Sequence, residues 1–275
     1  MMMRSFAFML GFVLLIQPAH ADVHALVIGT DYIEADDPRL ELANPVVDAR
    51  MVSASLKRSA ATEVTLLEEP DAKLWESELD LFVNSLAPDD IALLYYAGHG
   101  FQIEGRNYFL AADGVSLIPL EDLIRRLTEK ARGAIVVVDA CRNNPLASEQ
   151  VQPTERSLAL NIAGVTRSVE SITLYDVANA GPGLAQLGNL RGLSAVVFFS
   201  TDPGNVAEDG ATPGKGSPFA TIFARQIKRR QSLDETFRKT AIEVNKKTEG
   251  RQSPWRQGDL PFNVFVGGMR VLPIP

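Results

Sequence analysis

Short apolar runs alternate with amphipathic segments along most of the chain. Each run ends at a glycine, a charged residue or a polar residue, a pattern typical of strands that are buried on both faces of a sheet. The runs predict strands at His24–Gly29, Val64–Leu67, Ile91–Tyr96, Ala134–Val138 and Ala195–Phe199, with a last short strand at Phe262–Val266.

Segments with helical spacing of apolar residues lie between these runs. They predict helices at Asn44–Arg58, Asp71–Leu86, Leu120–Arg132, Ser217–Arg230 and Ser232–Thr248. A small hairpin is expected at Gln102–Leu110, around Glu104-Gly105. The alternation of strands and helices predicts an α/β fold with a mainly parallel sheet and helices on both faces. Ligands of such folds bind outside the carboxyl ends of the strands, so the residues that follow each strand matter most.

The first 21 residues have the features of a secretory signal. A basic start at Arg4 precedes an apolar run, Phe6–Ile16, and Ala19-His20-Ala21 has the small-x-small form of a signal-peptidase site. The run is shorter than the roughly 20 residues of a spanning helix; a buried N-terminal helix or a membrane anchor is the alternative. We expect cleavage after Ala21, no membrane span in the mature protein, and export to the periplasm or the medium.

Composition narrows the function classes further. The chain has 275 residues, of which 46% are apolar and 22% charged, so it is too apolar for a disordered protein and long enough for one large domain. Its single cysteine excludes an internal disulfide. The net charge of −7 offers no general affinity for nucleic acid or anionic lipid.

Two polar residues at strand ends form the candidate catalytic pair. His99 follows the third strand between two glycines, which allow a sharp turn and a close approach to a substrate, and Cys141 follows the fourth strand. If these strands are parallel neighbours, a nucleophilic thiol and its base meet at one edge. His24, the other histidine of residues 22–275, opens the first strand and is expected to be structural. One cysteine and one well-placed histidine make half a zinc site at best, so no metal is predicted.

Two carboxylates are expected at the same edge. Asp139 lies two residues before Cys141 in an extended segment, so both should face one cleft, and Asp202 follows the fifth strand. A carboxylate beside a thiol opposes thiolate formation unless a cation offsets it. We therefore expect Asp139 and Asp202 to form a pocket for a substrate Lys or Arg. A loop cap or a local salt bridge is the alternative for each.

At this point the sequence resembles the caspase-like cysteine peptidases, in particular their bacterial metacaspase (orthocaspase) branch. The resemblance rests on the Gly98-His99-Gly100 segment and on Asp139-Ala140-Cys141, with the histidine 42 residues upstream of the cysteine. The caspase signature has Gln-Ala-Cys and a histidine about 50 residues upstream; the Asp form is the metacaspase-like one. The resemblance extends over nearly all of the mature chain and includes the segments Ala25–Gly29, Leu42–Pro45 with Asp48-Ala49, Phe199–Ala207, Gly216–Phe219 and Gly250–Trp255.

The resemblance implies a caspase-like three-layer sandwich, with a mainly parallel sheet of about six strands. Residues 22–275 would form one peptidase domain, divided into a large-subunit-like part (22–141), a linker (142–192) and a small-subunit-like part (193–275). Self-cleavage would fall in the linker at Arg156, Arg167 or Arg191.

By the same resemblance, Cys141 is the nucleophile and His99 the proton shuttle. The N–H groups of Gly100 and Cys141 would form the oxyanion hole, and Asp139 and Asp202 would line the pocket for the basic side chain. The implied function is an exported endopeptidase that cleaves proteins or peptides after Arg or Lys. A caspase-like binding or regulatory module with little or no peptidase activity is the alternative.

Two departures from the family pattern stand out. Many metacaspases need calcium and carry an acidic insertion after the His-Gly pair, whereas Phe101–Ala112 is short and holds one acid, Glu104. We therefore expect no cofactor, and calcium dependence is disfavoured. Asn143-Asn144-Pro145 replaces the usual small residues after the cysteine, so the oxyanion loop is expected to differ in detail.

Overall fold

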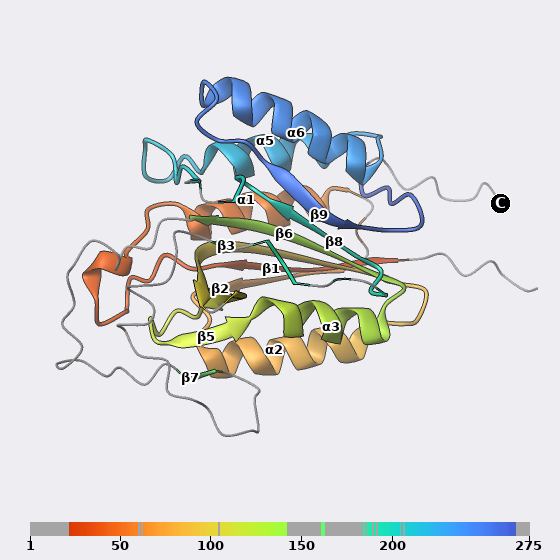
Figure 1. Cartoon of the computed structure of the whole chain (residues 1–275), viewed down its shortest axis with the longest axis horizontal. Coiled ribbons are helices and arrows are strands. Elements are labelled where there is room, and N and C mark those ends of the chain that lie inside the picture. Colours follow the sequence, from red (N-terminus) through yellow and green to blue (C-terminus); the bar gives the residue numbers. More distant parts are fainter. Residues whose placement is uncertain are drawn as a thin grey trace, which may run out of the picture.

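Six strands form one mainly parallel sheet at the centre of the computed structural model (Figure 1). The structure describes residues 22–59, 61, 63–103, 105–141, 161–162, 184, 186–188, 190, 192–203, 205 and 207–267. Across the sheet the strand order is β2, β1, β3, β6, β8, β9, and β9 alone is antiparallel to its neighbour. The bounds of these strands are Val23–Gly29 (β1), Glu63–Glu68 (β2), Ile91–Ile103 (β3), Gly133–Cys141 (β6), Ala195–Phe199 (β8) and Trp255–Asp259 (β9).

Three further short strands extend the sheet beyond the carboxyl end of β3. The last part of β3 pairs antiparallel with β4, which pairs with β5, and β5 pairs in turn with β7. Their bounds are Arg106–Leu110 (β4), Ser116–Pro119 (β5) and Asn161–Ile162 (β7). The hairpin between β3 and β4 turns at Gly105, as expected, with a φ of 80° there.

Helices cover both faces of the sheet, which confirms the expected α/β sandwich (Figure 1). One face packs against the helices α1, α5 and α6, and the other packs against α2 and α3. The helix bounds are Pro45–Lys57 (α1), Ala72–Ser85 (α2), Leu120–Lys130 (α3), Pro218–Gln226 (α5) and Leu233–Lys247 (α6). Ser232, where the last predicted helix begins, is the N-cap of α6, because its hydroxyl accepts a hydrogen bond from the Glu235 N–H at 3.2 Å.

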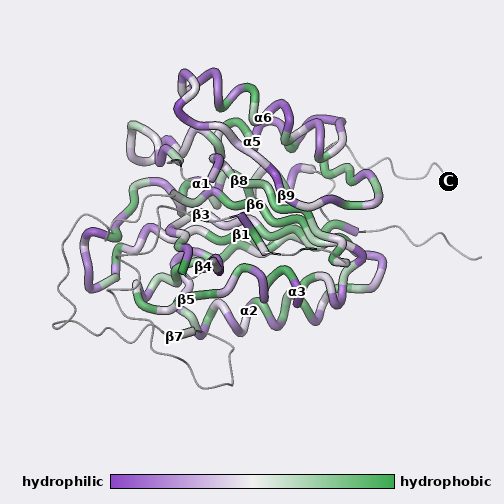
Figure 2. Tube along the Cα trace, viewed as in Figure 1, coloured by the Kyte–Doolittle hydropathy of each residue, from purple (hydrophilic) through white to green (hydrophobic). Residues whose placement is uncertain are grey.

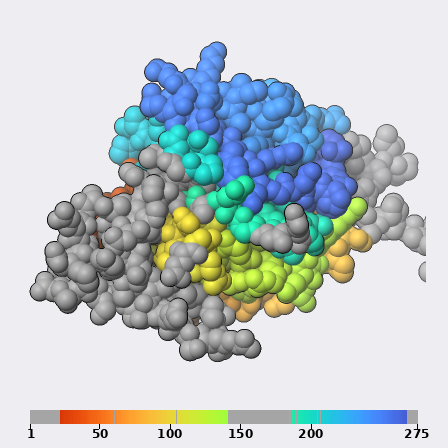
Figure 3. Space-filling model, in the orientation of Figure 1, coloured from red at the N-terminus to blue at the C-terminus, as the bar shows by residue number. Residues whose placement is uncertain are grey.

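The apolar core explains why the central strands lack a polar face. Successive residues of β1 point to opposite faces of the sheet. Leu26 and Val27, for example, enter different core layers, and both are fully buried. Figure 2 shows hydrophobic residues gathered in the central strands and hydrophilic ones on the outer sides of the helices. In Figure 3 the C-terminal helices and β9 cover the upper side of this core. No helix in the described part of the chain is long and apolar enough to cross a bilayer.

The structure corrects two of the expected strands. No strand forms at Phe262–Val266; the last strand is instead β9, Trp255–Asp259. The apolar residues of 262–266 pack irregularly against the α5–α6 side of the core, while β9 is a polar edge strand. The third strand does not turn at the two glycines but continues through His99 to Ile103. It can continue because its partner changes there from the parallel β6 to the antiparallel β4.

Candidate active site

His99 and Cys141 lie directly opposite one another on adjacent strands. β3 and β6 are parallel and in register from the pair Ile91–Gly133 to the pair His99–Cys141. This last pair stands at the carboxyl end of the central sheet, where ligands of α/β folds bind. The structure thus confirms that the two residues emerge at one edge.

The His99 imidazole has a defined tautomer. Its Nε2 lies 2.8 Å from the Leu40 carbonyl oxygen, which belongs to the short 3-10 helix η1 (Pro38–Leu40). A carbonyl oxygen can only accept, so Nε2 carries the proton and Nδ1 holds a lone pair. Nδ1 is buried and has no hydrogen-bond partner among the described residues. The ring therefore presents one basic nitrogen that nothing in the described fold uses.

Two tyrosines hold the His99 backbone. The His99 N–H donates to the Tyr32 hydroxyl at 2.8 Å, and the Tyr96 hydroxyl donates to the His99 carbonyl at 2.7 Å. The two hydroxyls lie 2.9 Å apart, and the Tyr32 ring packs on the imidazole with centroids separated by 4.8 Å. Tyr32 and Tyr96 are both fully buried, so this support is rigid.

Burial also sets the protonation of His99. The side chain is 3% exposed, and desolvation lowers its pKa to about 4, although the hydrogen bond to Leu40 acts in the opposite direction. At neutral pH the ring is therefore uncharged, and Nδ1 is able to take a proton.

The glycines beside His99 have different roles. Gly98 has a φ of 154°, and a Cβ at this position would lie 2.6 Å from the Tyr96 hydroxyl oxygen. The tyrosine pair therefore requires glycine there. Gly100 pairs with Phe109 on β4, one position beyond the histidine. This places the predicted oxyanion-hole residues, Gly100 and Cys141, at the same end of the sheet.

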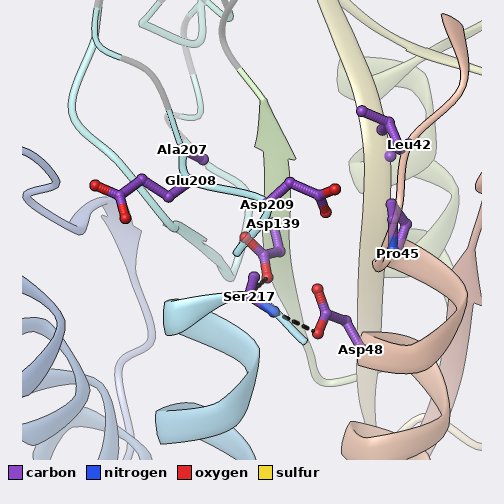
Figure 4. Close-up of a pocket in the computed structure, with 9 residues that line it drawn as sticks. Leu42, Pro45, Asp48, Asp139, Ala207, Glu208, Asp209 and Ser217 are labelled. Atoms are coloured by element: carbon purple, nitrogen blue, oxygen red, sulfur yellow. Dashed lines mark hydrogen bonds between the residues drawn. The ribbon is translucent and has the colours of Figure 1, made fainter. Parts of the chain in front are cut away.

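A small acidic pocket adjoins this pair (Figure 4). It contains about 220 Å³ of space, open solvent included. Asp48, Asp139 and Asp209 face a common space in Figure 4, while the Glu208 carboxylate extends away from it. The complete lining is Leu42, Pro45, Asp48, Gly98, Asp139, Ala207, Glu208, Asp209 and Ser217. Gly98 precedes His99 and Asp139 lies two residues before Cys141, so the pocket reaches the candidate pair.

Ser217, the residue immediately before α5, links two of these carboxylates. The Ser217 N–H donates to Asp48 Oδ1 at 2.8 Å, and the Ser217 hydroxyl donates to Asp139 Oδ2 at 2.7 Å. The Tyr95 hydroxyl donates to the same Asp139 oxygen at 3.2 Å. Because Ser217 is the N-cap of α5, the positive end of the helix dipole also faces the carboxylates. Asp209 is held separately, since its Oδ2 accepts from the Ala43 N–H at 2.9 Å.

The three carboxylates are costly to ionise together. Burial raises the pKa of Asp48 far above its usual value, and the nearby Asp139 raises it further. Burial likewise raises the pKa of Asp139, to about 6, and the pKa of Asp209. A cation bound among them would offset both the burial cost and the repulsion.

Sequence reasoning identified only one acid of this pocket. Asp139 lies where it was expected, but Asp202 is not among the lining residues. Asp202 is partly buried, and its Oδ1 accepts hydrogen bonds from Thr201 and Asn205. The pocket gains Asp48 and Asp209 instead. The predicted cleavage sites Arg156, Arg167 and Arg191 and the signal segment 1–21 lie outside the described residues.

Comparison with known proteins agrees with this geometry. The model of the caspase domain family matches residues 22–265. The chain belongs to the caspase-domain family. Members of this family are cysteine peptidases, which fits a histidine and a cysteine at adjoining strand ends.

Two solved structures resemble the fold. Protein GSU0716 from Geobacter sulfurreducens superimposes with a TM-score of 0.59 at 16% identity, over 90% of this chain and 98% of that chain. Caspase-1 from Spodoptera frugiperda superimposes with a TM-score of 0.59 at 14% identity, over 90% of this chain and 93% of that chain. At these identities the likeness shows a shared fold. No curated protein sequence matches the chain.

Proposed function

We propose that this caspase-domain protein is an exported cysteine endopeptidase of the metacaspase type, which cleaves peptide bonds after Arg or Lys. The observation that carries the proposal is the register pair His99–Cys141, in which the histidine presents an unprotonated Nδ1 that has no hydrogen-bond partner among the described residues. A general base beside a cysteine is the arrangement that nucleophilic peptide cleavage requires.

The proposed reaction has two halves. Nδ1 of His99 takes the Cys141 thiol proton, and the sulfur attacks the scissile carbonyl carbon. The backbone N–H groups of Gly100 and Cys141 hold the resulting oxyanion. The C–N bond then breaks as His99 returns the proton to the leaving amine, which leaves a thioester. Water, deprotonated by His99, hydrolyses the thioester and frees the thiol.

The acidic pocket supports the choice of basic substrates. It holds Asp48 and Asp139 buried at 2% and 7% exposure, within a space lined by three converging carboxylates and, among the residues that the structure describes, by no Lys, Arg or His. A basic side chain that pairs with these carboxylates would stabilise their charged forms, which burial and mutual repulsion disfavour in the empty pocket.

Peptide reporters test the proposal directly. Purified protein should cleave short peptides that end in Arg or Lys before the reporter group and should leave the matching Asp peptide intact. Cys141→Ala should abolish turnover, while Ser85→Ala, on the surface end of α2, serves as a control that keeps full activity. Preference for the Asp peptide would contradict the pocket assignment, and turnover that survives Cys141→Ala would contradict the mechanism.

Self-cleavage in the linker belongs to the same proposal. Arg156, Arg167 and Arg191 are the sites at which the active protein would cut itself, without a need for calcium. Intact-mass measurements on wild type and Cys141→Ala, each with calcium and with a chelator, test this. Fragments that appear only in the wild type support self-cleavage, and identical masses exclude it.

A further inference from the structure

A second cluster of chemically active side chains lies at the other end of the sheet. Asp22 stands immediately before β1, His24 is the second residue of β1, and Asp90 stands immediately before β3. Since β1 and β3 are parallel and Val23 pairs with Ile91, all three lie at the amino ends of the strands. His99 and Cys141 lie at the carboxyl ends, so the proposed peptidase mechanism does not use this cluster.

The three side chains each bring one oxygen or nitrogen atom to a common point. These atoms all lie within 4.8 Å of one another. His24 Nε2 lies 3.4 Å from Asp90 Oδ2. Ligands at about 2.05 Å from a tetrahedral metal ion stand about 3.3–3.4 Å apart, so this separation equals one edge of a zinc coordination shell.

The surroundings hold the ligands in place. Asp90 Oδ2 accepts a hydrogen bond from the Ala87 N–H at 2.8 Å, and Asp90 Oδ1 accepts one at 3.3 Å from the Asp22 nitrogen, which becomes the α-amine after the expected cleavage behind Ala21. The side chains of His24 and Asp90 are only 12% and 10% exposed. A partly buried, fixed carboxylate beside an imidazole is preorganised for a cation, because little ordering cost remains to be met on binding.

The second nitrogen of His24 has the partner that metal-bound histidines usually have. Nδ1 lies 3.4 Å from Glu63 Oε2 on β2, and it is buried without a hydrogen bond among the described residues. A carboxylate at this distance would favour the tautomer that carries the proton on Nδ1 and leaves Nε2 free to bind metal, once the two groups close to hydrogen-bond geometry. One imidazole and two carboxylates, with no thiolate, suit Zn²⁺ and similar divalent transition metals.

From this geometry we propose a structural zinc-type site formed by His24 Nε2 and the carboxylates of Asp22 and Asp90, with Glu63 orienting the imidazole and water completing the shell. Such an ion joins the start of β1 to the start of β3. It therefore stabilises the folded chain without taking part in the peptidase reaction, because it binds the native state and not the unfolded one.

Zinc titration of metal-free protein tests the site, with Cys141→Ala as the background because the thiol also binds zinc. Isothermal titration should show one Zn²⁺ per chain, and the melting temperature should rise with added zinc. His24→Asn should abolish this binding, and Glu63→Gln should weaken it about 10- to 100-fold. Asp22→Asn, which keeps the backbone contacts of the strand, should weaken binding while the melting temperature of the metal-free protein stays unchanged.

The alternative is a polar cluster of His24, Glu63 and Asp90 that binds no metal. In that case zinc neither binds stoichiometrically nor raises the melting temperature in the Cys141→Ala background, and this outcome overturns the proposal. Zinc binding that His24→Asn and Asp22→Asn leave unchanged overturns it as well. Adding His99→Asn to the background removes the other histidine, and the His24-dependent binding should survive that change.

Discussion

The Ser217 hydroxyl donates a 2.7 Å hydrogen bond to the Asp139 carboxylate, although 78 residues separate the two in sequence. This contact joins the start of α5 to the end of β6. The Ser217 N–H reaches Asp48 on α1 in the same way. One N-cap residue therefore sets the positions of two buried acids beside the candidate catalytic pair, and specificity should depend on this junction.

Asp139→Asn should reduce kcat/KM for an Arg reporter about 10- to 100-fold, mainly through KM, because a charged hydrogen bond to the substrate becomes a neutral one. Asp202→Asn is the matched control: Asp202 lies outside the pocket, so its loss should change kcat/KM less than about threefold. Steady-state kinetics with Arg reporters of identical sequence compare the two. Equal losses of kcat/KM in both variants would mean that Asp202 also contributes to binding the basic side chain.

The affinity for basic substrates should depend on pH. Burial raises the pKa of Asp139 to about 6, so the carboxyl is neutral below that pH and charged above it. KM for an Arg reporter should therefore fall as the pH rises from 5 to 7. In Asp139→Asn this fall should be largely lost. The pKa of His99 is lowered to about 4, so the histidine stays neutral across this range and does not account for the change.

Asp48→Asn should stabilise the protein at neutral pH and weaken substrate binding. The folded-state pKa of Asp48 lies above its usual value of about 3.9, so the unfolded chain releases its proton first as the pH rises. The free energy of unfolding therefore falls above about pH 4, and a neutral Asn avoids this loss while its oxygen still accepts from Ser217. Urea unfolding at pH 8 should show a gain of more than about 1 kcal/mol.

The same comparison at pH 4 provides the control for Asp48→Asn. At pH 4 the wild-type carboxyl is protonated in the folded state and about half protonated in the unfolded chain, so the difference in unfolding free energy should shrink to a few tenths of a kcal/mol. A gain of equal size at both values of pH would mean that ionisation of Asp48 is not its cause.

Tyr32→Phe should lower kcat about tenfold and leave KM nearly unchanged. The change removes the hydroxyl that accepts from the His99 N–H and leaves that buried donor unpaired, at a cost of about 1–3 kcal/mol in stability. Tyr95→Phe is the matched variant, because its hydroxyl contacts Asp139 instead, and it should raise KM while sparing kcat. The opposite division between kcat and KM would contradict the positioning role of Tyr32.

The edge of the sheet at which His99 and Cys141 lie could be predicted, because the apolar strands that lead to these two residues are recognisable in the sequence. Apolar strands such as Ile91–Tyr96 are visible in sequence, and two neighbouring parallel strands must bring their ends together. The acidic pocket could not be predicted in full, because Asp48 and Asp209 reach Asp139 only through packing of distant segments. The Asp48-Ala49 segment was already part of the family resemblance, and this was the available signal.

The misplaced strand has a similar explanation. β9, with the sequence WRQGD, is an edge strand with mostly exposed side chains, so it lacks the apolar alternation that identifies strands. Its position is set by antiparallel pairing with β8, in which Asp259 lies opposite Ala195 and Trp255 lies opposite Phe199. Trp255 then stacks on Phe199 with ring centroids 5.1 Å apart, a contact that follows from this pairing.

Among the glycines of β3 and its hairpin, Gly98 should tolerate replacement by alanine least, with the largest loss of stability and of activity. The new Cβ would lie 2.6 Å from the Tyr96 hydroxyl oxygen and 2.9 Å from that of Tyr32, at a φ of 154° that L-residues rarely adopt. Overpacking and backbone strain together should cost about 3 kcal/mol or more, and His99 should lose its alignment. Gly105→Ala is the control: it also has a positive φ, but its Cβ would meet nothing within 4 Å, so the loss should stay near about 1 kcal/mol with activity retained. Chemical denaturation and reporter kinetics on both variants compare them, and equal stability losses would show that the tyrosine pair does not constrain the Gly-His-Gly segment.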